Sequence, residues 1–170
     1  MVSKGKKSMK RVLSMLVENK PGALARVVGL FRQRGYNIES LNVAPVDDGS
    51  YSRLTVATRG TESAVEQIMK QINKLIDIIK VADLTEGDHH ELELALIKLK
   101  KLKNISNLKN IIKGFNGKII KTDNLTCVIS VTGTSIDINN LLKSLKKYKI
   151  IEIVRSGSIG LHESQKTLTI

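Results

Sequence analysis

The sequence predicts an α+β protein made of two ferredoxin-like βαββαβ units. Two observations support this prediction. Runs with strand-like apolar patterns alternate with runs whose apolar residues recur at helical spacing, and the order strand, helix, strand, strand, helix, strand occurs twice. A polar joint, TEGDHH, separates the two occurrences. We therefore expect a basic leader at 1–10, a first domain at 11–84, a linker at 85–90 and a second domain at 91–170.

The first half opens with a strand and a helix. RVLSMLVE, residues 11–18, is a nearly continuous apolar run, which is typical of a buried strand. Helical spacing begins after Gly22, and Gly35 supplies a helix stop because glycine adopts the left-handed conformation without a Cβ clash. The apolar stripe of this predicted helix comprises Leu24, Val27, Val28 and Phe31.

A hairpin, a second helix and a closing strand complete the first half. Strands are predicted at 37–45 and 51–59, and the turn VDDGS between them contains an Asp-Gly pair, which is a hairpin signal. Thr61 is placed to cap the second helix. The run IIKVADL at 78–84 is the last strand.

The second half repeats this order with more lysine. ELELALIKLK alternates cleanly, and an Asp-Asn pair marks the later hairpin. We expect strands at 91–100, 117–122, 125–132 and 150–155 and helices at 105–115 and 135–145. Two helices on one face of each antiparallel sheet leave the other face, or an edge, available for association.

The charge is unevenly divided along the chain. Its net value is +12, of which residues 1–90 contribute +4 and residues 91–170 contribute +8. Much of the excess is exposed-looking lysine, and the chain has two Phe, three Tyr and no Trp to stack on bases. A solvated lysine-rich face, or a docking face for an acidic partner, explains this at least as well as RNA binding.

The sequence contains no recognisable catalytic or metal-binding arrangement. Asp47 and Asp48 lie in a predicted turn, where carboxylates are common turn formers. The run RSGSIGL lacks the lysine and the strand and helix context of a phosphate-binding loop. His89, His90 and His162 have no partner at ligand spacing. We therefore predict no catalytic residues, no metal site and no cofactor bound by this chain.

Composition also indicates where the chain resides. No apolar run approaches the roughly 20 residues that span a bilayer, and no signal-peptide core follows the basic start. Cys127 is the single cysteine and lies in an apolar run, so a buried thiol and a reducing compartment are expected. We expect a soluble, cytoplasmic protein without membrane or nucleic-acid partners; a plastid is the alternative if the source is a photosynthetic eukaryote.

The turn before the first helix has the chemistry of a carboxylate site. The backbone N–H groups of Gly22, Ala23 and Leu24 can point outward at the positive end of the helix dipole. Asn37 opens the following strand, and its amide group can both donate and accept hydrogen bonds, as a zwitterionic amino acid requires. The same residues also make an ordinary helix start and restart of the chain, so local chemistry leaves both interpretations open.

The run VLSMLVENKPGALARVVGLFRQRGYNIESLNVAPVDDGSYSRLTV closely resembles the start of the small, regulatory subunits of acetolactate synthase (acetohydroxyacid synthase). The resemblance continues through QINKLIDIIKV to VRSGSIGL and covers nearly the whole chain after the leader. It implies that the first domain is an ACT domain, an amino-acid-binding βαββαβ module. The second half departs more from the family, so the resemblance rests mainly on the first half.

The resemblance implies a non-catalytic subunit that activates a thiamine-diphosphate-dependent catalytic subunit and confers feedback inhibition, usually by valine. Thiamine diphosphate, Mg and FAD are then expected only in that large partner. ACT domains pair as a homodimer, with effector sites at the interface. The matched positions are Asn19, Gly22, Ala23 and Leu24 on one chain and Asn37 and Ile38 on the other.

Two other functions remain open at this stage. A stand-alone amino-acid-sensing ACT protein would share the same site without an enzyme partner. A basic RNA-binding protein would need aromatic residues on its central strands, and LTVAT and LTCVISVT contain none. Within the family, the sequence does not distinguish valine from leucine or isoleucine as the effector.

Overall fold

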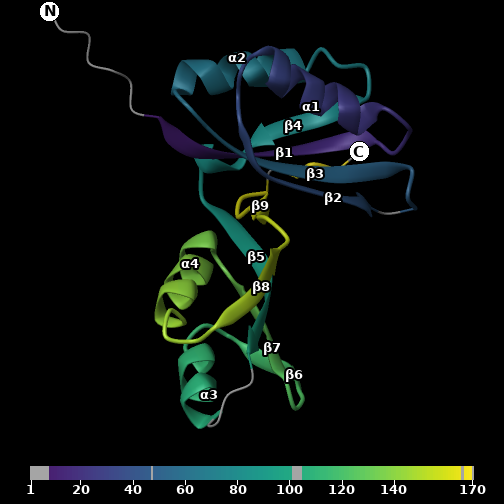
Figure 1. The fold of residues 1–170 in the computed structure, drawn as a ribbon. Coiled ribbons are helices and arrows are strands. Elements are labelled where there is room, and N and C mark those ends of the chain that lie inside the picture. Colours follow the sequence, from purple (N-terminus) through teal and green to yellow (C-terminus); the bar gives the residue numbers. More distant parts are fainter. Residues whose placement is uncertain (1–7, 47, 101–104, 166, 170) are drawn as a thin grey trace, which may run out of the picture. The chain divides into compact units, whose positions relative to one another are not determined.

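The computed structural model describes residues 8–46, 48–100, 105–165 and 167–169. It confirms the predicted α+β class: two antiparallel sheets, each with two helices (Figure 1). The chain divides into two compact units, Met1–His90 with Gly160–Ile170 and Glu91–Ile159. Each unit follows the predicted βαββαβ order.

The first unit contains six main elements and one short 3-10 helix. In chain order they are β1 (Met9–Glu18), α1 (Ala23–Gln33), β2 (Ile38–Val46), β3 (Tyr51–Gly60), α2 (Glu62–Ile72), β4 (Ile78–Asp83) and η1 (Leu84–Glu86). The sheet order is β2-β3-β1-β4, so β2 and β4 are edge strands. All of the pairings are antiparallel.

The second unit repeats this topology. Its elements are β5 (His89–Lys100), α3 (Ser106–Lys113), β6 (Lys118–Thr122), β7 (Thr126–Gly133), α4 (Ser135–Ser144) and β8 (Ile150–Arg155). A short strand, β9 (Ile159–His162), follows, and all of it but its first residue belongs to the first unit. The sheet order is β6-β7-β5-β8, and the short β9 pairs with β5 off this path. Sequence reasoning did not predict β9.

The two units differ from the predicted domains at three places. Residues 1–7 of the expected leader, 1–10, lie outside the described residues, and Met9 and Lys10 already belong to β1. The expected linker, 85–90, is not irregular throughout, because it contains part of η1 and the first two residues of β5. Residues 160–170 belong with the first unit, although they were predicted to lie in the second domain. The sequence after RSGSIGL has no strong periodicity, so it does not indicate that the chain goes back to the first unit.

Both ends of α1 follow from glycine. The helix ends in a Schellman arrangement, in which the Tyr36 amide bonds the Phe31 carbonyl at 3.0 Å and Gly35 has φ 69°. Its core face differs from the predicted stripe: Leu24 and Val28 are 37% and 36% exposed. The buried residues are Ala23, Val27, Leu30 and Phe31. The buried face is rotated relative to the prediction because it includes the small Ala23. A pattern based on large apolar residues does not identify an alanine as a core position.

The helix-facing side of the first sheet forms the main core of this unit. Leu13, Met15 and Val17 of β1 pack with residues of β3 and the two helices. Because side chains alternate along a strand, the intervening Val12, Ser14 and Leu16 lie on the opposite face. They are also fully buried or nearly so.

The C-terminal segment explains why this second face is buried. Arg53 and Lys80 both pair with Leu16 in the strand register, so they lie on that face. Their side chains donate to the carbonyls of Leu168 and Thr169. Figure 1 shows the chain end beside β3. The expectation that this face is left open is therefore wrong for the first unit.

Candidate functional site

A tight turn leads the chain from β1 into α1. The Ala23 amide donates to the Lys20 carbonyl at 3.3 Å, and Gly22 between them has φ 88° and ψ −15°. Pro21 followed by a glycine in this conformation is a type II turn. A side chain at Gly22 would be strained because its φ lies in the left-handed region.

The N-terminus of α1 has no side-chain cap. The Arg26 amide donates to the Gly22 carbonyl at 3.0 Å and closes the first helical turn. Within the described residues, the amides of Gly22 and Leu24 form no backbone hydrogen bond, whereas the Ala23 amide is used by the turn. Two of the three predicted donors therefore remain for an anion at the positive end of the helix.

Asn19 attaches this turn to the β2–β3 hairpin. Its backbone amide donates to the Ser50 carbonyl and its side-chain Nδ2 to the Gly49 carbonyl, both at 2.8 Å. Asn19 thus has a structural role at the predicted site. Its Oδ1 accepts no hydrogen bond from the described residues and can still face a ligand.

A buried carboxylate holds two cations beside the turn. Asp77 lies just before β4 and is 1% exposed. Its Oδ2 pairs with Nε of Arg26, and its Oδ1 lies 3.4 Å from Nζ of Lys20. Lys20 also pairs with Glu18. Two basic and two acidic side chains therefore meet where α1 begins.

The Arg26 guanidinium lies against Gly22. A Cβ atom on Gly22 would be 3.1 Å from Nη1 and 3.7 Å from Cζ of Arg26. Because Asp77 engages Nε, the outer nitrogens Nη1 and Nη2 are left without a hydrogen bond to the described part of the chain. The Arg26 side chain is 44% exposed, so solvent or a ligand can reach it.

The ion pairs fix the protonation states of this cluster. The hydrogen bond from Arg26 holds the pKa of Asp77 below its ordinary value of 3.8, and Lys20 adds to this effect. The same contact raises the pKa of Arg26, and the hydrogen bond to Glu18 raises the pKa of Lys20. Asp77, Arg26 and Lys20 are therefore charged at neutral pH.

Asn37 and Ile38 lie far from this turn within one chain. Ile38 pairs with Thr58, whereas Glu18, at the turn, pairs with Tyr51 seven residues away along β3. At about 3.3 Å per residue, this separation is roughly 23 Å. Asn37 is exposed, and Ile38 packs partly against the core. The two predicted groups of site residues do not meet in a single chain.

Sequence reasoning missed the three charged residues of the cluster. Lys20 and Arg26 flank Gly22 in the sequence, and their proximity to the turn was a usable signal. Asp77 is 51 positions from Arg26, and nothing in its local sequence marks it. Only the return of the chain into β4 brings its carboxylate to the start of α1.

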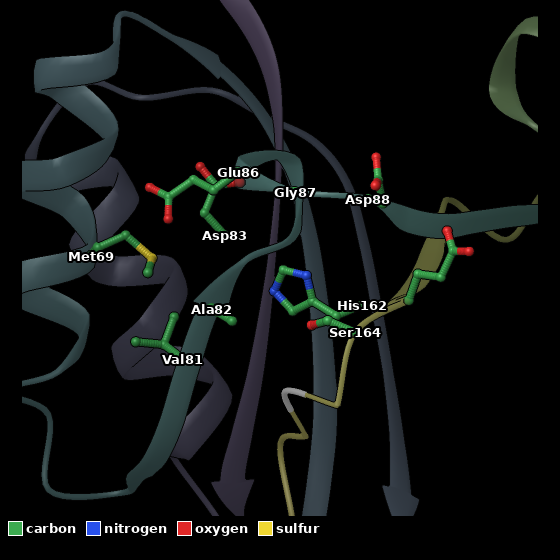
Figure 2. Close-up of a pocket in the computed structure, with 10 residues that line it drawn as sticks. Met69, Val81, Ala82, Asp83, Glu86, Gly87, Asp88, His162 and Ser164 are labelled. Carbon is green, nitrogen blue, oxygen red and sulfur yellow. The ribbon is translucent and has the colours of Figure 1, made fainter.

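The first unit also contains a separate, acidic pocket of about 610 Å³. Figure 2 shows Met69 on α2 and Val81 and Ala82 on β4, with His162 entering from the C-terminal segment. Its lining comprises Met69, Val81, Ala82, Asp83, Glu86, Gly87, Asp88, His162, Glu163 and Ser164. No predicted site residue lines it, and its carboxylates disfavour an anionic ligand.

The glycine-serine run of the second unit has a structural role. Glu93 is 3% exposed and accepts from Arg155 through both oxygens, at 2.6 and 2.7 Å. Ser135 donates to the same carboxylate at 2.9 Å, and its Oγ lies 3.1 Å from Oγ of Ser158. Gly157, with φ 74°, turns the chain between these partners. The run fastens the end of β8 rather than forming a phosphate loop.

Over the part of the chain that the structure describes, no group of three or more His, Cys, Asp or Glu side chains is arranged to hold a metal ion. No helix in these ranges is long and apolar enough to cross a membrane. Cys127 is buried, as predicted.

Comparison with known families gives two matches that together cover most of the chain. Residues 13–80 match the AHAS small subunit-like ACT domain. Residues 92–164 match the family described as small subunit of acetolactate synthase. The two matches fall on the two βαββαβ units.

Individual relatives agree with these matches. The acetolactate synthase isozyme 3 small subunit of Salmonella typhimurium is 44% identical over 162 residues, covering 94% of this chain and 99% of the relative. A probable acetolactate synthase small subunit of Archaeoglobus fulgidus is 40% identical, covering 93% and 99%. The crystal structure of the acetolactate synthase small subunit from Thermotoga maritima superposes with a TM-score of 0.84 at 32% identity, covering 93% and 99%.

Proposed function

Because the chain belongs to the family of acetolactate synthase small subunits, we propose that it is the non-catalytic regulatory subunit of acetolactate synthase in branched-chain amino-acid biosynthesis. The observation that carries this proposal is the identity of 44% over 94% of the chain, spanning both units. In this role the chain activates a large catalytic subunit in the cytoplasm. Thiamine diphosphate, Mg and FAD belong to that partner.

The effector of the proposed subunit is valine, bound where α1 begins. The free amides of Gly22 and Leu24 and the helix dipole suit its carboxylate. The exposed Leu24 offers apolar surface to its side chain. The acidic pocket is the less suitable place, because a carboxylate ligand would face four carboxylates there.

A homodimer through the ACT domains completes the site. One chain holds the Gly22 turn and its own Asn37 roughly 23 Å apart, so two chains are needed to place both around one ligand. The edge strand β2 and the exposed Leu24 and Val28 of α1 are suitable contact surfaces. An isologous dimer would then carry two equivalent sites.

Inhibition requires that valine bind one arrangement of the complex better than another. A tenfold preference corresponds to about 1.4 kcal/mol of coupling. A site shared between two chains suits this mechanism, because closing around the ligand changes their relative orientation. Valine then biases the catalytic partner without touching its active centre.

Reconstitution with the acetolactate synthase large subunit of the same organism tests the proposal. The full-length chain should co-purify with the large subunit, raise its acetolactate production and make it sensitive to valine. The chain alone should form no acetolactate. Valine binding without capture of the large subunit would instead favour a stand-alone amino-acid sensor, and turnover by the isolated chain would contradict a non-catalytic role.

A further inference from the structure

We propose that Arg26 is a carboxylate-binding residue of the effector site and that Asp77 is the residue that positions it. This inference rests on the proposed function, because it concerns the same site at the start of α1. It adds a charged contact to a site otherwise made of backbone amides, and it assigns a purpose to a buried carboxylate distant in sequence. The ligand class is an α-amino acid with a free carboxylate.

The geometry of Arg26 leaves a binding edge free. Asp77 engages Nε, so the guanidinium plane is fixed while Nη1 and Nη2 remain unbonded to the described residues. Those nitrogens lie on the side of Gly22 where a side chain would project. A carboxylate approaching the unbonded Gly22 amide therefore meets a guanidinium fork, the donor that best matches its two oxygens.

Burial makes Asp77 suitable as a positioning residue. Its side chain is 2% exposed, whereas those of Arg26 and Lys20 are 44% and 49% exposed. The carboxylate is thus fixed beneath two cations that reach solvent. Its Oδ1 makes no hydrogen bond within normal limits and has only the 3.4 Å contact with Lys20. Asp77 therefore makes one hydrogen bond to Arg26 and leaves the other guanidinium nitrogens available, so Arg26 can bind a ligand carboxylate while it stays paired with Asp77.

The second unit provides an internal control for this assignment. The bond from the Lys100 amide to the Lys149 carbonyl corresponds to the bond from Glu18 to Asp77, and both measure 2.9 Å. The bond from Lys109 to Ile105 corresponds to that from Arg26 to Gly22. The equivalents of Gly22, Arg26 and Asp77 are thus Ile105, Lys109 and Lys149. The backbone framework does not require a buried acid here, so Asp77 is specific to the first unit.

Calorimetric titration of the full-length chain with L-valine and with L-valinamide, which lacks the carboxylate, tests this inference. We expect Arg26→Gln to weaken valine binding roughly tenfold, the effect of removing one charged hydrogen-bonding partner. Valinamide binding should change less than twofold. Asp77→Asn should reduce the same preference for valine, because the fork is no longer held by a charge. A merely structural role would weaken both ligands equally.

Arg32→Gln is the matched control, since it removes an exposed cation from the last turn of the same helix. It should leave both affinities within twofold. If Asp77→Asn does not fold, Arg26→Gln decides the question. Wild-type protein that binds no branched-chain amino acid contradicts the proposed function itself. Wild-type protein that binds valine while Arg26→Gln binds it equally well overturns only this inference.

Discussion

The two units place an ion pair at the same point of the fold but with opposite signs. In the first unit Arg11 on β1 faces Asp83 at the end of β4, and Leu13, two residues on, pairs with Asp83. In the second, Glu93 on β5 faces Arg155 at the end of β8, and Ala95 pairs with Arg155. Both units thus hold a pair of opposite charges at this end of the fold, with the signs exchanged between the two strands.

At the opposite end of the sheets, the two units differ in chemistry. There the first unit has Gly22, Arg26 and Asp77, whereas the second has Ile105, Lys109 and Lys149. Two backbone hydrogen bonds correspond, but Gly22 is left-handed, with φ 88°, whereas Ile105 has φ −91°, so both the backbone at the helix start and the side chains differ. The comparison indicates that the scaffold is shared and that the proposed site belongs to one unit.

Gly22→Asp should produce the largest functional change. The backbone at residue 22 has φ 88°, a conformation that strains any residue with a Cβ atom. The new side chain would project against the Arg26 guanidinium, where its carboxylate would take the place of the ligand carboxylate. We expect valine inhibition of the reconstituted enzyme to weaken about 100-fold or more, with activation retained. Gly114→Asp adds the same charge in the second unit, at the residue that follows α3, where φ is −68°, and should leave inhibition unchanged. If valine inhibits the Gly22→Asp enzyme at the same concentrations as the wild-type enzyme, the effector site does not lie at the Gly22 turn.

Arg155→Ala should be the most destabilising change at the paired charges. It leaves Glu93 buried without its bidentate partner, which typically costs about 3 kcal/mol. Arg11→Ala should cost less, about 1 kcal/mol, because Asp83 keeps its hydrogen bonds from Thr85. Urea denaturation followed by circular dichroism measures both. Equal losses would show that the two pairs are equivalent in energy as well as in place.

Removal of residues 163–170 should have a smaller effect on stability. It uncovers the face of β1 that bears Val12, Ser14 and Leu16 and removes the bonds from Arg53 and Lys80. We expect a loss of about 1 to 2 kcal/mol and increased binding of a hydrophobic dye. Lys80→Ala removes a single exposed bond and serves as the control, with a loss below about 0.5 kcal/mol. An unchanged midpoint and dye signal would mean that the segment does not protect this face in solution.

The smallest expected effect is a pH dependence at Glu93. Burial raises its pKa, but the hydrogen bonds from Arg155 and Ser135 and the Arg155 charge outweigh burial and hold the pKa below 4.5. The resulting stabilisation is complete above pH 4.5 and is lost as pH falls through the folded-state pKa. In Arg155→Ala burial dominates, the pKa rises and the sign reverses. The stability difference between wild type and variant should therefore shrink on acidification from pH 6 to pH 3; a constant difference would contradict this.

Much of the fold could be predicted because periodicity and turn residues agree along the chain. Thr61 caps α2, as its position before an apolar helical pattern predicted, and Thr134 has the same role at α4, which begins at the predicted Ser135. The Schellman end at Gly35 was equally visible in the sequence. Local patterns were less informative about which face of a helix is buried. Leu24 and Val28 belong to the apolar helical repeat of α1, but both are exposed.

The candidate site was only half predictable. The Pro-Gly turn, the free helix amides and the amide chemistry of Asn37 follow from the local sequence, whereas the expected roles of Asn19 and Ile38 came from family resemblance. Asp77 could not be predicted, because its contact with Arg26 depends on how two segments 51 residues apart return to one end of the sheet. Charged residues that act through tertiary contacts carry no local signature.

Backbone amide chemical-shift mapping by NMR, with L-valine titrated into the full-length chain, tests the central claim most directly. The account predicts the largest shifts at Gly22, Ala23, Leu24, Asn37 and Ile38, with smaller ones at Arg26 and Asp77. Residues 105–115 and 149, the equivalent positions of the second unit, should not move. Shifts concentrated in the second unit, or valine binding that leaves Gly22–Leu24 unperturbed, would contradict a site built by the first unit alone.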